Sequence, residues 1–195
     1  LGVPLAWILA RSNMPGRSIL RAVVVLPVVL PPVVGGIGLL QALGREGVVG
    51  RWLYESVGIQ LTFTIWGAIV ATTFVSMPLV VLATEAGLRS LDPRYERAAA
   101  TLGASSWYTM RRVTLPMLAP AVAAGAVLCW ARALGEFGAT ITFAGNLAGR
   151  TQTLPLAVYE ARQTDPGGAI FLSLLLVVLS LVVLVAMRGR ITQAA

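Results

Sequence analysis

The 195-residue chain contains no histidine and no lysine, and Cys129 is its single cysteine. Without histidine, catalytic Ser-His and Cys-His pairs are excluded, and a Cys/His metal site has no ligands. One cysteine cannot form a disulfide framework within the chain. The lack of lysine also excludes the Gly-rich loop ending in Lys-Ser/Thr that binds ATP phosphates. We therefore expect no catalytic residue, no metal and no cofactor in this chain.

Charge is scarce as well. Only 12% of the residues are charged and 57% are hydrophobic, with a mean hydropathy of +0.82, whereas about a quarter of the residues in soluble domains are charged. So little charge cannot cover a water-facing surface, which predicts an integral membrane protein. The net charge of +7 comes entirely from arginine. The arginines lie in short clusters between apolar runs and not on one face with aromatic residues, so no nucleic-acid partner is predicted.

Long apolar runs predict the membrane spans. A helix needs about 20 apolar residues to cross the hydrocarbon of a bilayer. Four runs meet this length: 20–43, 58–83, 118–143 and 168–187. The first contains Pro27, Pro31 and Pro32, which predicts a kinked helix.

The apolar segment 1–10 is about half a span long, and we interpret it as the end of a helix whose beginning is missing. The chain is thus expected to be an N-terminally truncated, all-α, polytopic bundle. It would have about five spans, the first partial, within a single domain over 1–195.

The arginines also predict the orientation. They concentrate in the first connection, the third connection and the C-terminal tail, whereas acidic residues balance them in the second and fourth connections. The arginines of the first group are Arg11, Arg17, Arg21, Arg89, Arg94, Arg97, Arg111, Arg112, Arg188 and Arg190. Basic connections stay on the cytoplasmic side of a membrane. This predicts a multi-pass protein of a bacterial or archaeal cell membrane whose third connection and C-terminus face the cytoplasm.

The third connection, residues 85–117, is named the central insert. Asp92 is placed to cap a helix that has Pro93 at its first position and runs over 95–102. Gly103 is expected to end this helix in the left-handed conformation. Ser105 or Ser106 can then cap a second helix, which Pro116 is expected to end. The pattern alone leaves two interpretations open: an amphipathic linker resting on lipid headgroups, or a docking surface for a partner.

The spacing within the insert resembles the EAA loop of permease subunits of ABC importers. The matching positions are Ala98, Ala99, Gly103, Val113, Leu115 and Pro116. One position departs, because Arg97 stands where that pattern has glutamate, with Glu96 one residue earlier. The resemblance implies a type-I importer permease fold and a coupling loop that docks on a separate ATPase. It also implies two ATP-binding subunits, a second copy of this chain and an external substrate-binding protein. The chain itself would not be an enzyme, since the partner hydrolyses ATP.

A second resemblance concerns the cargo. Residues 26–36, 130–146 and 149–156 look like the molybdate permease branch, and sulfate permeases share the segment ALGEFG. This implies import of an oxyanion, molybdate in first place, with sulfate and tungstate as alternatives. A more distant alternative is an ion-coupled secondary transporter, which predicts mid-membrane acidic residues and an inverted repeat. No repeat is visible, and Glu136 is the acidic residue that we assign to a span.

Two sets of polar residues have open roles. Arg132 and Glu136 are one helical turn apart on the predicted third full span, with Glu136 near its outer end. They either line the translocation path as part of an outer gate or pair to hold helices together. Asn146, Thr151 and Gln152 lie on the predicted outer loop, and they either contact the binding protein or are turn residues.

Overall fold

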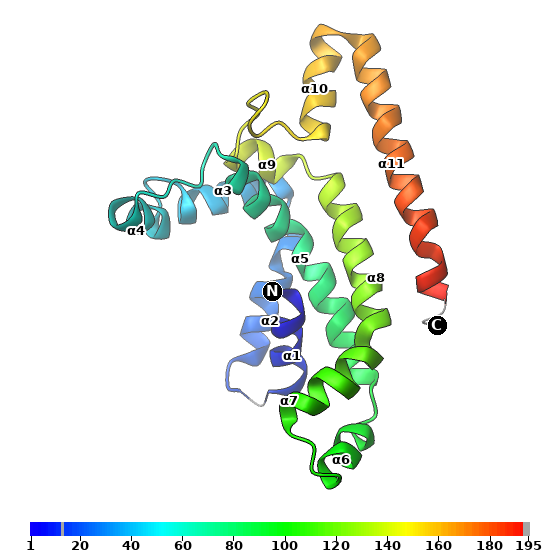
Figure 1. Cartoon of the computed structure of the whole chain (residues 1–195). Helices are drawn as coiled ribbons and strands as arrows, with labels where there is room; N and C mark the ends of the chain where they lie inside the picture. Colours follow the sequence, from blue (N-terminus) through cyan, green and yellow to red (C-terminus); the bar gives the residue numbers. More distant parts are fainter. Residues whose placement is uncertain (13, 193–195) are drawn as a thin grey trace.

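The computed structural model describes residues 1–12 and 14–192, with side chains up to Ala186 within these ranges. The regular structure of this part is helical. Its elements are α1 (Gly2–Arg11), α2 (Arg17–Val29), α3 (Pro32–Leu43), α4 (Val48–Val57), α5 (Ile65–Ser90), α6 (Arg94–Thr101), α7 (Ser106–Thr109), the π-helical turn η1 (Met110–Thr114), α8 (Leu115–Leu134), α9 (Gly138–Phe143), α10 (Leu154–Thr164) and α11 (Pro166–Thr192). Figure 1 shows α5, α8 and α11 running lengthwise, with α6 at one end of the molecule and α10 at the other.

Three helices are long and apolar enough to cross a membrane: Ile65–Ser90, Ser106–Leu134 and Pro166–Ala186. Two shorter apolar helices, Gly2–Arg11 and Pro32–Leu43, accompany them. The predicted all-α membrane class is therefore confirmed. The predicted span 168–187 falls within α11, and the side chains of its part Pro166–Ala186 are almost entirely unburied within the chain. The side chains of Arg188 and Arg190, which were used for the orientation, lie outside the described residues.

Helix α5 is the centre of the bundle and packs against α1, α2, α8 and α9. Its 26 residues correspond to about 39 Å at 1.5 Å per residue, enough to cross a bilayer. The side chain of Thr64 accepts a hydrogen bond from the Gly67 N–H at 3.2 Å and caps its first turn. The hydroxyls of Thr72 and Ser76 donate to carbonyls one turn earlier, at 2.7 and 2.6 Å. These polar groups are thus satisfied inside the helix, as hydrocarbon surroundings require.

The predicted kinked helix over 20–43 is instead two helices, α2 and α3, which meet at Leu30 and Pro31. Both residues are extended, with ψ of 138° and 132°. Each precedes a proline, and the proline ring disfavours the helical conformation of the residue before it. Neither helix is long enough alone to cross the hydrocarbon, since α2 has 13 residues and α3 has 12.

Two further predicted spans have different bounds in the structure. The run 58–83 forms a helix only from Ile65, and this helix continues to Ser90 inside the central insert. The run 118–143 is interrupted after Leu134, because Gly135 ends α8 and the short helix α9 starts at Gly138. The apolar pattern located these membrane segments, but it did not reveal the break that separates α8 from α9.

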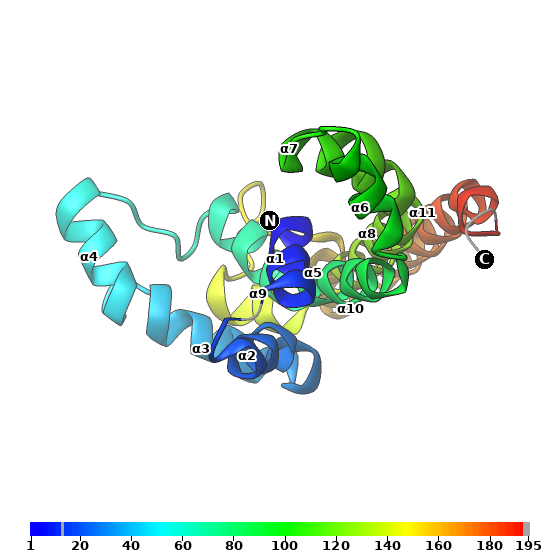
Figure 2. The same ribbon diagram turned by 90° about the horizontal axis from the view of Figure 1, so that it is seen from below.

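Helix α9 packs closely against α3 at Gly36. A Cβ atom at this buried position would lie 2.8 Å from the Ala139 Cα and would overlap the Thr142 hydroxyl. Only glycine fits at this distance, so Gly36 sets the contact between the two helices. Figure 2 shows α3 and α4 extending away from the bundle, on the side opposite α11.

Candidate functional site

After the last turns of α5, the central insert contains a short helix, α6, that an aspartate caps. Asp92 Oδ1 accepts a hydrogen bond from the backbone N–H of Arg94 at 2.8 Å, as the sequence predicts. After eight residues the helix ends at Gly103, whose φ of +80° is the predicted left-handed conformation. The Ala104 N–H then donates to the Ala99 carbonyl at 3.1 Å, which closes the turn. No residue of α6 is buried, so the helix stands out from the body of the protein.

The second half of the insert is the bent start of a membrane helix. Ser105 caps it, since its hydroxyl accepts from the Tyr108 N–H at 3.2 Å. Helix α7 passes through the π-helical turn η1 into α8 without interruption, over Ser106–Leu134. Pro116 was expected to end this helix. It instead occupies the first turn of α8, and the α7–η1–α8 helix continues through it. The second half of the insert and α8 therefore form one continuous helix.

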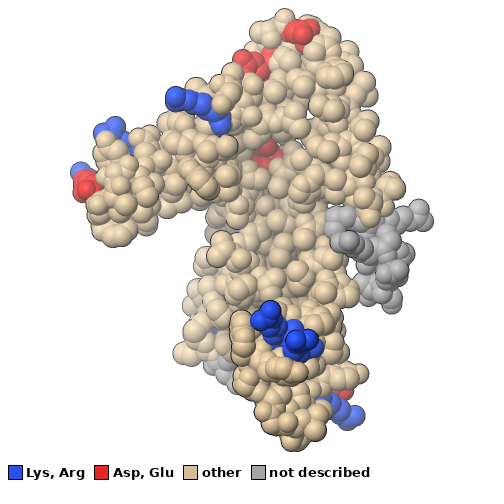
Figure 3. Space-filling view, in the orientation of Figure 1, with Lys and Arg blue, Asp and Glu red and all other residues tan. Residues whose placement is uncertain are grey.

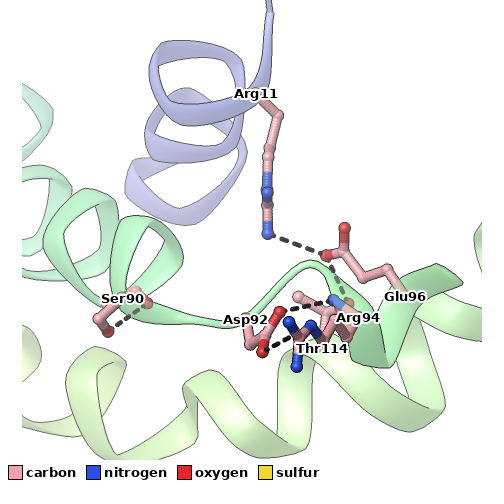
Figure 4. Close-up of polar contacts among 7 residues, drawn as sticks. Arg11, Ser90, Asp92, Arg94, Glu96 and Thr114 are labelled. Carbon is pink, nitrogen blue, oxygen red and sulfur yellow. Dashed lines mark hydrogen bonds and ion pairs between the residues drawn. The ribbon is translucent and has the colours of Figure 1, made fainter. Parts of the chain in front are cut away.

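Glu96 joins the insert to the first helix of the chain. Its Oε1 lies 3.2 Å from Arg11 Nη2 at the end of α1 and accepts a hydrogen bond from the Thr114 hydroxyl at 3.2 Å (Figure 4). The side chains of Arg11 and Glu96 are only 26% and 28% exposed. Glu96, one residue before the position where the EAA pattern has glutamate, thus has partners inside the protein. Arg97 itself is exposed.

The remaining predicted residues of the insert lie around a hollow between its two arms. Ala99, Gly103 and Val113 line this hollow of about 640 Å³ together with Tyr108. Ala98 is exposed on α6. The other two predicted residues continue into α8: Leu115 is half-buried and Pro116 is exposed. The structure therefore brings most of the predicted positions onto one protruding unit.

A second carboxylate, Glu85, was not recognised as a site residue from the sequence. It is 1% exposed on α5 and accepts hydrogen bonds from Arg89, the shorter at 2.7 Å. Arg21 of α2 lies 3.4 Å from its Oε2, an ion-pair contact without hydrogen-bond geometry. Glu85 comes just after the predicted run 58–83, and a carboxylate at the end of a span is costly unless it is paired, which was the available signal. Glu85 therefore holds α2 against α5.

The predicted pair of Arg132 and Glu136 forms, with Arg132 Nη1 2.8 Å from Glu136 Oε2. Its position differs from the prediction. Glu136 lies beyond the end of α8 and is 2% exposed, so it is buried in the junction with α9. Its Oε1 accepts the backbone N–H of Ala139 at 2.7 Å and so satisfies the first turn of α9. Arg132 keeps 34% of its side chain exposed. The pair is thus a structural joint with one accessible cation.

The three predicted outer-loop residues have partners within the loop region. The side-chain amides of Asn146 and Gln152 both donate to Glu160 Oε2, at 2.8 and 2.6 Å. Thr151 is 3% exposed, and its hydroxyl accepts from the Leu147 N–H at 3.0 Å. These contacts order the loop before α10. They support a structural role for the three residues beside any contact with another protein.

The described residues thus present the spans, the protruding insert and the paired internal charges of a membrane permease component. The sequence profile of the family described as "Binding-protein-dependent transport system inner membrane component" matches residues 2–189. The chain belongs to this family, and it is a multi-pass ABC-importer permease subunit.

The chain is similar to permeases of molybdenum and sulfate transport systems. The chain is 52% identical over 192 residues to the molybdenum transport system permease protein ModB of Mycobacterium tuberculosis, covering 97% of this chain and 72% of that protein. It is 48% identical to the Haemophilus influenzae ModB, covering 92% of this chain and 82% of that protein. The sulfate transport system permease protein CysT of Escherichia coli is 43% identical, covering 83% of this chain and 58% of that protein.

Solved structures support the fold. A bacterial ABC transporter that imports the acidic polysaccharide alginate matches with a TM-score of 0.65 at 16% identity, covering 99% of this chain and 71% of that chain. The alginate transporter in complex with a pentasaccharide-bound periplasmic protein matches with a TM-score of 0.69 at 20% identity, covering 98% and 72%. At this identity the likeness concerns the fold alone.

Proposed function

We propose that this chain is the membrane-spanning subunit of an ATP-driven importer of an oxyanion, and that the oxyanion is molybdate. The assignment of molybdate as the cargo rests on the 52% identity to a molybdenum permease over 97% of the chain. Sulfate is the second candidate, because sulfate permeases also match, at 43% identity and below. Tungstate shares the tetrahedral shape and charge of molybdate and stays an alternative cargo.

The proposed assembly contains two copies of this chain, two ATP-hydrolysing subunits and an external substrate-binding protein. Its orientation places the central insert and the C-terminus in the cytoplasm. Figure 3 shows basic side chains at the end of the molecule where α6 lies, and others toward the opposite end, where an acidic patch adjoins those on α4. The end of α1, with Arg11, and the start of α2, with Arg17, lie toward the same end (Figure 1). Such clustering of arginine at one end is typical of the cytoplasmic side.

The proposed coupling passes through the insert along two routes. One is covalent, because α7 continues through η1 into α8. The other is the ion pair of Glu96 with Arg11, which joins α6 to α1, and α1 packs on α5. Since α5 also packs on α8, both routes converge on the same pair of helices. ATP-dependent closure of the partner would then favour one of two arrangements of the spans.

Arg132 is proposed to face the path of the anion, whereas Glu136 holds the junction of α8 and α9. This division follows from their exposure, 34% and 1% of the side chains. Glu136 largely balances the charge of Arg132. The accessible arginine would therefore attract an anion without binding it tightly. Tight selection of the cargo would then rest with the external binding protein.

The cargo is tested by uptake of labelled molybdate in cells that carry this chain, its ATPase and its binding protein as their one molybdate system. Excess sulfate is added at equal and higher concentrations. We expect that sulfate at a concentration equal to that of molybdate leaves the molybdate uptake largely unchanged. Sulfate that abolishes uptake at equal concentration moves the assignment to sulfate, and no uptake of either anion contradicts the proposal.

A further inference from the structure

Arg97 stands on the outer face of α6 without a carboxylate partner in the part of the chain that the structure describes. Residues three and four apart share a helix face, so Arg97 lies beside Arg94 and Thr101. All three are exposed. Arg94 is 3.8 Å from Asp92, at the limit of an ion pair, whereas no such contact exists for Arg97. The outer face of α6 is therefore basic.

The acidic groups of the insert have other partners, and Glu85 at its start pairs with Arg89 and Arg21. Asp92 caps α6 through the Arg94 N–H. Glu96 faces the body of the protein, where it contacts Arg11 and Thr114. Figure 4 shows both carboxylates with these partners. The carboxylates of the insert thus have partners other than Arg97, whose positive charge stays exposed on α6.

Helix α6 is also short and lacks the tertiary packing that a short helix needs for stability. It has eight residues, none of them buried, whereas helices below about 12–15 residues are marginal in water without tertiary packing. Its outer face is therefore suited to a surface that buries it. Lipid headgroups suit Arg111 and Arg112 better, because these residues lie in η1, directly before the membrane helix α8. Helix α6 lies farther along, at the tip of the molecule (Figure 1).

We infer that the groove of the ATPase subunit that receives α6 carries a carboxylate opposite Arg97. This inference rests on the proposed function and adds the chemistry of the partner surface. A guanidinium and a carboxylate form two parallel hydrogen bonds in a fixed geometry, which would set the register of α6 in the groove. Electrostatic pairing of this kind contributes mainly to partner choice and association rate.

The test uses the complete transporter with an affinity tag on the ATPase subunit. R97E and R97Q are compared with R112E, a matched charge reversal on η1. We expect R97E to lower co-purification of the permease by about tenfold or more, since like charges in an interface cost over 1.4 kcal/mol. R97Q should give a smaller loss, and R112E should leave co-purification unchanged. Selection for restored uptake in the R97E background should yield suppressor mutations in the ATPase subunit. These mutations should replace an Asp or Glu of that subunit by a basic or neutral residue.

The outcomes separate the two proposals. A wild-type chain that brings down no ATPase contradicts the proposed function itself. If R97E brings down the ATPase as well as the wild-type chain does, only the inference of an acidic groove is overturned. Suppressors confined to the permease, or a loss in R97E that tracks the anionic lipid content of reconstituted vesicles, assign Arg97 to the membrane and overturn the inference as well.

Discussion

Arg11 Nη2 lies 3.2 Å from Glu96 Oε1, so the last residue of α1 is joined to the tip of the central insert across 85 positions of sequence. Glu96 also accepts a hydrogen bond from Thr114 at 3.2 Å, and Thr114 belongs to the helix that continues into the membrane. One carboxylate therefore connects the insert to two membrane segments. We propose that these contacts transmit movement of the insert to the membrane helices of the importer.

Removing this carboxylate should uncouple the insert from α1. We expect E96Q to lower uptake by up to about tenfold, which corresponds to about 1.4 kcal/mol, with unchanged insertion into the membrane. The exchanged pair R11E/E96R should recover a large part of the loss, because it restores the attraction. T114V is the matched control, since it removes only the hydroxyl contact and should have the smaller effect. Equal uptake by E96Q and the wild type contradicts the coupling route through α1.

The left-handed turn at Gly103 should tolerate asparagine but not valine. The position has φ of +80° and open space around a built Cβ atom, so only backbone conformation restricts it. A β-branched residue there costs about 1–2 kcal/mol or more and would change the angle between α6 and α7. G103V should therefore lose uptake while G103N retains most of it. If both variants lose uptake, the glycine has a role other than its backbone conformation.

The contact of α3 with α9 should be sensitive to a single methyl group. At Gly36 a Cβ atom would lie 2.8 and 2.9 Å from Ala139 backbone atoms, whereas at Gly38 it meets nothing within 4 Å. Overpacking of this kind costs about 1–3 kcal/mol. G36A should lower the melting temperature of the detergent-solubilised protein, and G38A should leave it unchanged or slightly raised. Identical melting temperatures of the two variants contradict the close packing of α3 on α9.

Glu136 should be more important for its hydrogen bond than for its charge. In E136Q the amide oxygen can still accept the Ala139 N–H, whereas E136L removes this acceptor and leaves Arg132 without its partner. Loss of such a helix cap costs about 0.5–2 kcal/mol. Thermal unfolding should therefore rank the wild type and E136Q above E136L. If E136Q unfolds as early as E136L, the charge and not the cap holds the junction.

A separate variant tests the path role of Arg132. Replacing it alone leaves Glu136 buried without its charge partner, so the double change R132M/E136Q is used to keep the junction neutral. We expect this variant to insert and to bind the ATPase normally, with molybdate uptake reduced. Normal uptake assigns Arg132 to the structure of the joint only.

Much of the fold was accessible from the sequence because the signals are local. The apolar runs located the membrane segments, Asp92 marked the start of α6, and Gly103 marked its end. The break between α2 and α3 was misjudged as a kink, although Pro31 and Pro32 in succession each force the preceding residue out of the helix. The end of α8 at Gly135 was missed because hydrophobicity continues across it into α9.

The candidate site was less accessible because its contacts are distant in sequence. The spacing of the insert located Ala98, Ala99 and Gly103, but it gave no sign that Glu96 points toward Arg11. Glu85 had a usable signal as a carboxylate just after an apolar run, although its contact with Arg21 depends on how α2 packs against α5. Such pairings arise from tertiary packing, which no local pattern in a single sequence contains.

The most direct measurement of the central proposal is disulfide or bifunctional cross-linking from one position of α6. In a C129S background, A98C places a thiol on the exposed face of this helix, and L147C places one on the loop before α10 as the control. The account predicts that A98C links to the ATP-hydrolysing subunit and is protected from a membrane-impermeant thiol reagent in intact cells, whereas L147C is labelled from outside. Labelling of A98C from outside, or its failure to link to an ATPase that co-purifies, would contradict the account.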